Sequence, residues 1–160
     1  MKTKIAAVLI SLLFLISCGT EEQPKEGAPA ENTNSNKMIL KASNNMYVAI
    51  SADSTLSANQ SDATKAEVFE KVDQGNGKWG LKLSNGKFVC DERMKANVMV
   101  VNRDAVGEWE QFEIVTLEGG KINLKSSAGK FVCGDQSVGG RLIANRDQAG
   151  EWETFTAEPK

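Results

Sequence analysis

The chain contains three copies of one sequence unit, and this repetition limits its possible folds more than any other feature. Residues 82–112 align without a gap with residues 125–155, and about half of the positions are identical. A weaker first copy lies at residues 40–72. Three residue types recur near the end of each copy: Asn59, Asn102 and Asn145, then Glu67, Glu110 and Glu153, then Phe69, Phe112 and Phe155. Three equivalent structural units are therefore expected to share one core.

Each copy has the pattern of four short strands. In the third copy, residues alternate in polarity around Leu124 and again from Phe131 to Cys133, and turn residues such as Gly129 separate these segments. Alternation with a period of two predicts strands, and the short connections predict antiparallel pairing. No segment has a helical period. Residues 38–158 also contain no proline, which suits strands that are paired on both sides.

Twelve antiparallel strands in three units predict an all-β domain, a single β-trefoil. Three propeller blades would fall below the usual minimum of about four. A six-stranded barrel closed at one end by three hairpins removes exposed sheet edges. Each repeat is expected to send a leucine and an aromatic residue to a shared core; these are Leu40, Leu81 and Leu124, with Tyr47, Phe88 and Phe131.

The N-terminus has the pattern of an export signal. Lys2 and Lys4 precede an apolar run from Ile5 to Ile16. As a helix this run would rise about 18 Å, too little for about 30 Å of hydrocarbon. It therefore predicts a signal peptide at residues 1–17 rather than a membrane anchor.

The end of this run, Leu15-Ile16-Ser17-Cys18, resembles the bacterial lipobox. The resemblance implies cleavage before Cys18 and acylation of that residue, which would anchor the chain to a membrane. The alternative is an ordinary secretory signal with a chance cysteine at this position. Gly19 after the cysteine favours the outer membrane, by analogy with Gram-negative lipoproteins. Residues 18–37 are rich in Glu, Gln, Asn, Pro, Gly and Ser, so they predict a lipid-anchored flexible tether.

Composition excludes several function classes. The chain has no histidine, so it cannot have a His-dependent catalytic triad or a His zinc site. The formal charge is −2, and loss of the two signal lysines would make it −4, whereas a nucleic-acid binder needs a basic face. Asp91 and Glu92 are adjacent on a strand and would point to opposite faces, so they are not poised across a glycosidic bond. No enzyme activity, cofactor or metal is expected.

The pattern L-K-x-S-x-G-K-F-V-C, followed by N-R-D-x-x-G-E-W-E-x-F, resembles the fascin-like (actin-crosslinking-like) β-trefoil family. The resemblance covers residues 38–158. It is strong for the second and third copies and weaker for the first, which has Ala66 in place of tryptophan. Fascins have four such domains and bundle actin, so one trefoil does not imply bundling. Bacterial relatives resemble binding modules that accompany carbohydrate-active enzymes or lie on cell surfaces.

The repeated motif N-R-D-x-x-G-E-W-E supplies the candidate ligand-binding residues: Arg103, Asp104, Trp109, Arg146, Asp147 and Trp152. The indole rings suit either stacking on a sugar or packing beneath a hairpin. The arginines and aspartates, expected at hairpin tips, could contact glycan hydroxyls. Alternatively they form solvated ion pairs with Glu108 or Glu151. Asn102 and Asn145 are expected to cap turn backbone.

Two other residue types recur in the second and third copies. Lys82, Lys87, Lys125 and Lys130 flank the first hairpin, where they either extend over the barrel or form a basic strip for acidic polysaccharide. Cys90 and Cys133 are expected to be small buried thiols on the same side of the strand as Phe88 and Phe131. A disulfide between them would need Cα atoms within about 7 Å.

These observations lead to one functional hypothesis. The sequence predicts a non-catalytic binding lipoprotein of the cell envelope whose ligand is a glycan or polysaccharide. A protein-interaction or adhesin module of the outer membrane is the second hypothesis, with an envelope protein as partner. A purely structural envelope protein is the third.

Overall fold

A computed structural model describes residues 35–160, so the expected signal peptide, Cys18 and most of the tether lie outside the described residues. Every strand pairing in this part of the chain is antiparallel, and the only helices in it are four 3₁₀ turns. The strands are β1 (Lys37–Lys41), β2 (Tyr47–Ile50), β3 (Leu56–Gln60), β4 (Phe69–Gly75), β5 (Lys78–Lys82), β6 (Phe88–Glu92), β7 (Val98–Arg103), β8 (Gln111–Thr116), β9 (Lys121–Ser126), β10 (Phe131–Asp135), β11 (Arg141–Arg146) and β12 (Thr154–Pro159). The 3₁₀ turns are η1 (Ala63–Lys65), η2 (Arg93–Lys95), η3 (Glu108–Glu110) and η4 (Gln136–Val138).

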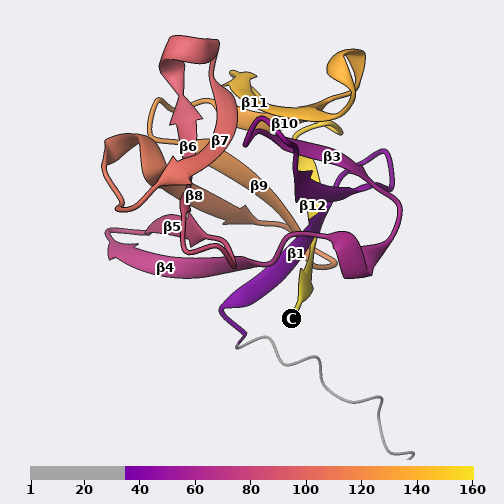
Figure 1. The fold of residues 1–160 in the computed structure, drawn as a ribbon, viewed down its shortest axis with the longest axis horizontal. Coiled ribbons are helices and arrows are strands. Elements are labelled where there is room, and N and C mark those ends of the chain that lie inside the picture. The colour runs from indigo at the N-terminus through magenta and orange to yellow at the C-terminus, as the bar shows by residue number, and fades with distance from the viewer. Residues whose placement is uncertain (1–34) are drawn as a thin grey trace, which may run out of the picture. The chain divides into compact units, whose positions relative to one another are not determined.

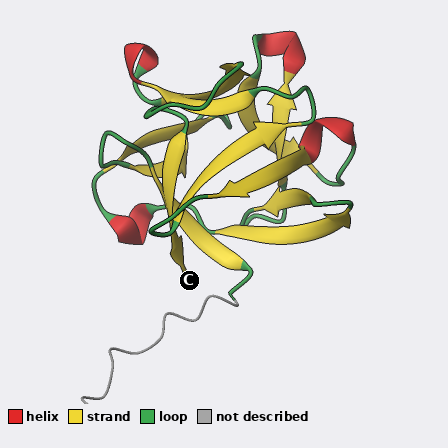
Figure 2. Ribbon diagram, turned by 180° about the vertical axis from the view of Figure 1, so that it is seen from behind, coloured by secondary structure: helices red, strands yellow, loops and turns green. Residues whose placement is uncertain are grey.

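Six of the strands form a closed ring. β1 pairs with β12, which continues through β9, β8, β5 and β4 back to β1. The other six strands form three hairpins, β2–β3, β6–β7 and β10–β11. β11 contacts both β3 and β7, which brings the three hairpins together across one end of the barrel (Figure 1). This arrangement is the predicted β-trefoil, and Figure 2 shows from behind its strands, the loops that join them and the short helical turns.

The central core confirms part of the sequence prediction. Leu40, Leu81 and Leu124 are buried in one apolar cluster with Phe69, Phe112 and Phe155. The other predicted aromatics, Tyr47, Phe88 and Phe131, do not belong to this cluster. The neighbouring valines occupy the core instead; they are Val48, Val89 and Val132.

A β-bulge in each hairpin accounts for this difference. Phe88 pairs with Arg103, but the next residue, Val89, pairs with Val101, which leaves Asn102 as the extra residue. The same shift leaves Asn59 and Asn145 unpaired in the other two hairpins. A bulge interrupts strict alternation and bends the strand. The triplicated asparagine is therefore the bulge residue, and the valine after the aromatic faces the core.

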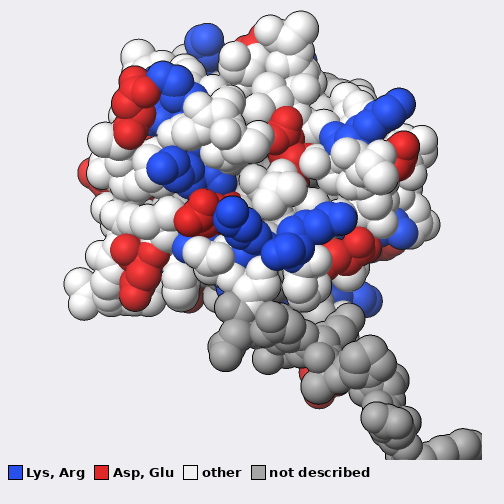
Figure 3. All heavy atoms as spheres, turned by 60° about the horizontal axis from the view of Figure 1, so that its bottom comes forward, with Lys and Arg blue, Asp and Glu red and all other residues white. Residues whose placement is uncertain are grey.

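The displaced aromatics lie under lysines from the preceding strand. The ammonium groups of Lys41, Lys82 and Lys125 are 5.4, 5.8 and 5.3 Å from the ring centroids of Tyr47, Phe88 and Phe131, respectively. Each pair is within the range of a cation–π interaction. Two of the four lysines in the predicted basic pattern, Lys82 and Lys125, thus cover aromatic rings, as does Lys41 in the first repeat. Figure 3 shows basic and acidic side chains interspersed over the face nearest the open end of the barrel.

Candidate functional site

The repeated N-R-D-x-x-G-E-W-E motif folds into an ion-pair network that closes the loop after each hairpin. In the second repeat, Arg103 donates a hydrogen bond to Glu92 at 2.8 Å, and its Nε lies 3.4 Å from Glu110. Glu110 also accepts a hydrogen bond from the Gly107 N–H at 2.8 Å. The network joins β7, β6 and the turn before β8.

The third repeat has the same network. Arg146 donates to Asp135 at 3.3 Å, its Nε lies 3.6 Å from Glu153, and Glu153 accepts from the Gly150 N–H at 2.7 Å. Both arginines are therefore ion-paired within their repeat, as one alternative had it. The predicted partners, Glu108 and Glu151, are wrong, because the buried carboxylates next to the bulge are closer.

The asparagines and aspartates of this motif lie at strand ends, not at hairpin tips as expected. Asn102 accepts a hydrogen bond from the Arg103 side chain at 2.7 Å, and Asn145 accepts one from the Cys133 thiol at 3.7 Å. The predicted capping of turn backbone by these asparagines is therefore wrong. The bulge explains their position.

The two aspartates lie on the surface beside the lysines that directly precede β6 and β10. Asp104 forms an ion pair with Lys87, and Asp147 forms the equivalent pair with Lys130. The aspartate side chains are 84% and 82% exposed, so water screens both pairs. A glycan would reach these residues only by competing with the lysines.

The tryptophans differ between the two repeats. Trp109 belongs to the 3₁₀ turn η3 and is half-buried, and the guanidinium of Arg93 lies 5.4 Å from its ring centroid. Trp152 occupies the equivalent turn but leaves 39% of its surface exposed. One indole is therefore occupied by a side chain of the protein itself, and the other is accessible.

The buried thiols were predicted correctly. Cys90 and Cys133 are free and fully buried. Burial, together with the neighbouring Glu110 carboxylate, raises the pKa of Cys90 to about 12. The thiols lie outside the central core cluster, on the strand face that the ion-pair networks cover. Both are poor nucleophiles for this reason.

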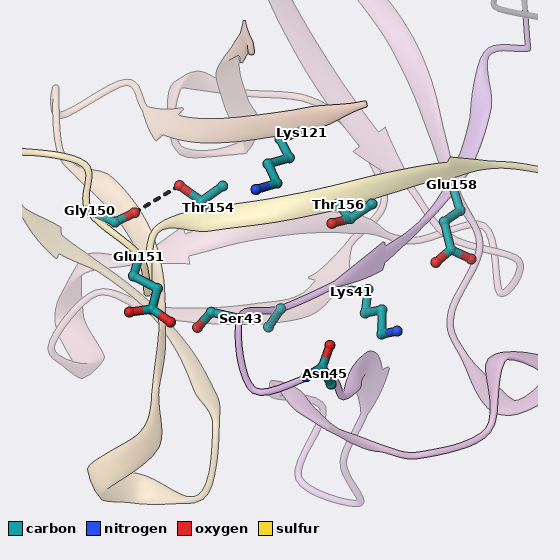
Figure 4. A pocket seen from close by; sticks show the side chains of 10 residues that line it. Lys41, Ser43, Asn45, Lys121, Gly150, Glu151, Thr154, Thr156 and Glu158 are labelled. Atoms are coloured by element: carbon teal, nitrogen blue, oxygen red, sulfur yellow. Dashed lines mark hydrogen bonds between the residues drawn. The ribbon is translucent and has the colours of Figure 1, made fainter. Parts of the chain in front are cut away.

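A groove of 500 Å³ lies where the first and third repeats meet, and none of the six predicted ligand-binding residues lines it. Its lining is polar: Lys41, Ala42, Ser43 and Asn45 from the first repeat, and Lys121, Gly150, Glu151, Thr154, Thr156 and Glu158 from the third. Figure 4 shows Glu151 and Ser43 toward one end of the groove, with Lys41 and Glu158 toward the other. The lining residues form no single motif in the sequence, because the groove joins residues from opposite ends of the domain.

Hydrogen bonds hold part of the groove wall in place. Thr154 donates to the Gly150 carbonyl at 2.8 Å, and the Tyr47 hydroxyl donates to Glu158 at 3.2 Å. Burial and the nearby Glu158 carboxylate raise the pKa of Tyr47, so its hydroxyl stays protonated. The described residues contain no cluster that could hold a metal ion. The side chains that line the groove can offer hydroxyls, ammonium groups and carboxylates to a polar ligand.

Comparison with known proteins places the chain in a family. The family model of the FRG1-like domain, a β-trefoil with a fascin-like fold, matches residues 64–158. The chain belongs to the FRG1-like domain family. The match to the family model covers more than half of this FRG1-like protein and confirms the fascin-like resemblance. The comparison with curated proteins found no match to this chain.

Solved structures share the fold of this FRG1-like domain. The designed threefold-symmetric protein ThreeFoil has a TM-score of 0.66 at 16% identity, covering 78% of this chain and 99% of its own. SeviL bound to asialo-GM1 saccharide has a TM-score of 0.60 at 10% identity, covering 78% and 98%. An exo-β-1,3-galactanase from Clostridium thermocellum has a TM-score of 0.67 at 11% identity, with coverage of 80% of this chain and 31% of the enzyme. At these identities the likeness shows the fold alone.

Proposed function

We propose that this FRG1-like protein is a non-catalytic saccharide-binding module of the cell envelope, with its binding site in the groove between the first and third repeats. The groove itself is the observation that carries the proposal. Its hydroxyls, amide, ammonium groups and carboxylates supply both donors and acceptors, which a sugar with several hydroxyls requires. A volume of 500 Å³ suits one or two sugar rings.

Structures of the same fold support a saccharide as the ligand class. SeviL holds a saccharide, and the galactanase carries this fold as about a third of a longer enzyme. In such an enzyme a trefoil can act as an accessory binding module.

The arrangement of carboxylates supports binding rather than hydrolysis. Glu151 and Glu158 line the groove at opposite ends in Figure 4, and Glu158 accepts a hydrogen bond from Tyr47. Asp91 and Glu92, adjacent on β6, contact Asn97 and Arg103 and do not line the groove. Glycoside hydrolysis needs two carboxyl groups that face each other across the bond to be cleaved.

The envelope location rests on the sequence. An acylated Cys18 would hold the domain at a membrane, and residues 18–37 would separate the two as a tether. The described residues include no helix long and apolar enough to cross a membrane. Mass spectrometry of the purified protein tests this part of the proposal, because acylation would add lipid to Cys18 and Cys18→Ser would abolish the addition.

A glycan-array and polysaccharide-retention screen of the full chain carrying Cys18→Ser tests saccharide binding. Retention by one sugar class is expected, and Thr156→Val in the groove should weaken it without lowering the melting temperature. The double variant Asp104→Ala and Asp147→Ala is the matched control for the strand-end residues and should bind normally. If the folded protein binds no glycan on the array, the proposal is overturned, and the search turns to a protein partner from the envelope.

A further inference from the structure

The three junctions between successive repeats have the same local geometry but different residues. At each junction, the turn before the last strand of one repeat faces the first hairpin of the next. The turn position is occupied by Lys65, Glu108 and Glu151 in the three repeats, and the facing hairpin position by Ser84, Ser127 and Ser43, respectively. These differences decide what each junction can hold.

The junction between the second and third repeats is filled by an arginine. Arg93, from the tip of the β6–β7 hairpin, donates to Glu108 at 3.1 Å and to Ser127 at 2.6 Å. Its guanidinium also lies over Trp109, 5.4 Å from the ring centroid. A serine hydroxyl, a carboxylate and an indole face thus surround one cation. Such a combination of a charge-assisted hydrogen bond and a cation–π contact is a recurrent way to bind cations.

The junction between the third and first repeats has counterparts of these three groups, but among the described residues no cation pairs with the glutamate. Glu151 and Ser43 both line the groove. Trp152 follows Glu151 in the chain and is partly exposed, although it is not one of the lining residues. Lys41 and Lys121 also line the groove, and the Lys41 ammonium lies over the Tyr47 ring. Gln136 takes the place of Arg93. Its amide is turned aside, because it accepts a hydrogen bond from Asn44 at 2.9 Å and donates one to the Gly134 carbonyl at 2.8 Å.

Other features of this junction keep it open. Gly134 stands where Asp91 lies beside Arg93 in the closed junction, so that this position has no side chain. In the described part of the chain the Glu151 carboxylate has neither an ion-pair nor a side-chain hydrogen-bond partner, unlike Glu108, which pairs with Arg93. The carboxylate is therefore available to a ligand.

The junction between the first and second repeats differs in charge. Lys65 replaces the glutamate, Ala66 replaces the tryptophan, and the smaller groove there has a volume of 260 Å³. Lys37, Lys82 and Glu70 line this smaller groove, so a cation there would meet two ammonium groups and one carboxylate, with no indole at the turn. Of the three junctions, the one between the third and first repeats is thus alone in combining an open groove with the cation-binding groups.

We propose that this groove selects saccharides that carry a free, protonated amino group, with Glu151, Ser43 and Trp152 holding that ammonium as Glu108, Ser127 and Trp109 hold Arg93. The inference rests on the proposed function and names its ligand class. Thr154 and Thr156, farther along the groove, suit the hydroxyls of the same sugar. These hydroxyl-bearing positions favour an amino sugar over the arginine side chain of a protein partner.

Titration of the full chain carrying Cys18→Ser with glucosamine oligomers and with matched N-acetylglucosamine oligomers tests the proposal. Binding of the amine form is expected to be about tenfold tighter, which is the contribution of one charge-assisted hydrogen bond. Glu151→Gln should remove this preference. Glu108→Gln, the same change in the closed junction, is the control and should leave the preference intact.

A second variant introduces into the open groove the arginine that fills the closed junction. Gln136→Arg should place a guanidinium in the open groove and exclude the ligand, so the glucosamine oligomer should bind at least tenfold more weakly. Its melting temperature would show whether the variant is folded.

Equal affinity for the amine and acetylated oligomers would overturn this inference and leave the saccharide-binding function in place. An equal effect of Glu151→Gln and Glu108→Gln would overturn it as well. Binding of an arginine-containing peptide without binding of any saccharide would overturn both the amino-sugar assignment and the proposed function.

Discussion

Arg103 donates a hydrogen bond to Glu92 at 2.8 Å across the β6–β7 hairpin, so the motif that repeats most clearly in the sequence has a structural role. The Glu92 side chain is only 11% exposed and that of Glu110, which faces the same guanidinium, only 7%. Two carboxylates are thus taken out of water around one arginine. Such carboxylates depend on the guanidinium for compensation of their charge.

Arg103→Ala is therefore expected to lower the free energy of unfolding by about 2 kcal/mol. Loss of one partner of a buried ion pair costs about 3–5 kcal/mol, and the partial exposure of Arg103 reduces this figure. Urea denaturation measures the change. Asp104→Ala removes the exposed pair with Lys87 and should cost less than about 1 kcal/mol. Equal losses in the two variants would contradict the network described here.

Sequence repetition was enough to predict the architecture. Regular spacing of Leu40, Leu81 and Leu124 and of the final phenylalanines predicted three equivalent units, and the period of two predicted strands. The bulge was not predictable from the period, because one extra residue such as Asn102 reverses which neighbour faces the core. The aromatics were therefore assigned to the core in place of the valines.

The groove was harder to predict than the fold. Glu151 is the counterpart of Glu108 in the alignment, yet Glu108 pairs with Arg93 and Glu151 has no ion-pair partner among residues 35–160. The difference arises from Gln136 and from Asn44, which belongs to another repeat about ninety residues away. Only the closed ring of strands brings such positions together, so the pattern within one repeat could not reveal the junction.

Alkaline pH should destabilise the protein through Cys90. Burial raises the pKa of this thiol from 9.0 to about 12, so the folded state keeps a proton that the unfolded state loses. Stability is then complete below pH 9 and falls as the pH rises from 9 toward 12, by up to about 1.4 kcal/mol per pH unit. Urea denaturation at pH 8 and pH 10 should show a steeper fall for the wild type than for Cys90→Ala. Parallel curves would rule out this contribution.

Gly140 is expected to tolerate no side chain. A Cβ there would lie 2.5 Å from the Ala58 carbonyl oxygen, on a residue with φ of +76°. Its own carbonyl accepts a hydrogen bond from the Ala58 N–H, which ties β3 to β11. Gly140→Ala should therefore cost more than about 3 kcal/mol. Gly139→Ala, with a φ of +72° and open space, should cost only about 1 kcal/mol. Similar melting temperatures for both variants would contradict the close approach.

The first repeat lacks a counterpart of Arg103, so we expect that introducing an arginine there would increase stability. Gln60 takes the position of Arg103, and its side chain donates to Asn59 at 3.1 Å, just as Arg103 donates to Asn102. Glu67, the counterpart of Glu110, is half-buried, and burial raises its pKa. The folded state therefore binds a proton more tightly than the unfolded state, and Glu67 reduces stability as the pH rises above its ordinary pKa of 4.5.

Gln60→Arg should supply the missing counter-charge to Glu67. We expect a gain of about 1 kcal/mol at pH 7, because the guanidinium favours the ionised carboxylate that burial disfavours. The gain should vanish below pH 4, where the carboxylate is protonated in both states. Urea denaturation at pH 7 and pH 3.5 measures both values. Gln74→Arg, which adds the same charge at an exposed position of β4, should change stability little at either pH. If Gln74→Arg stabilises the protein as much as Gln60→Arg, the gain comes from net charge, and the two repeats do not share the geometry inferred from their alignment.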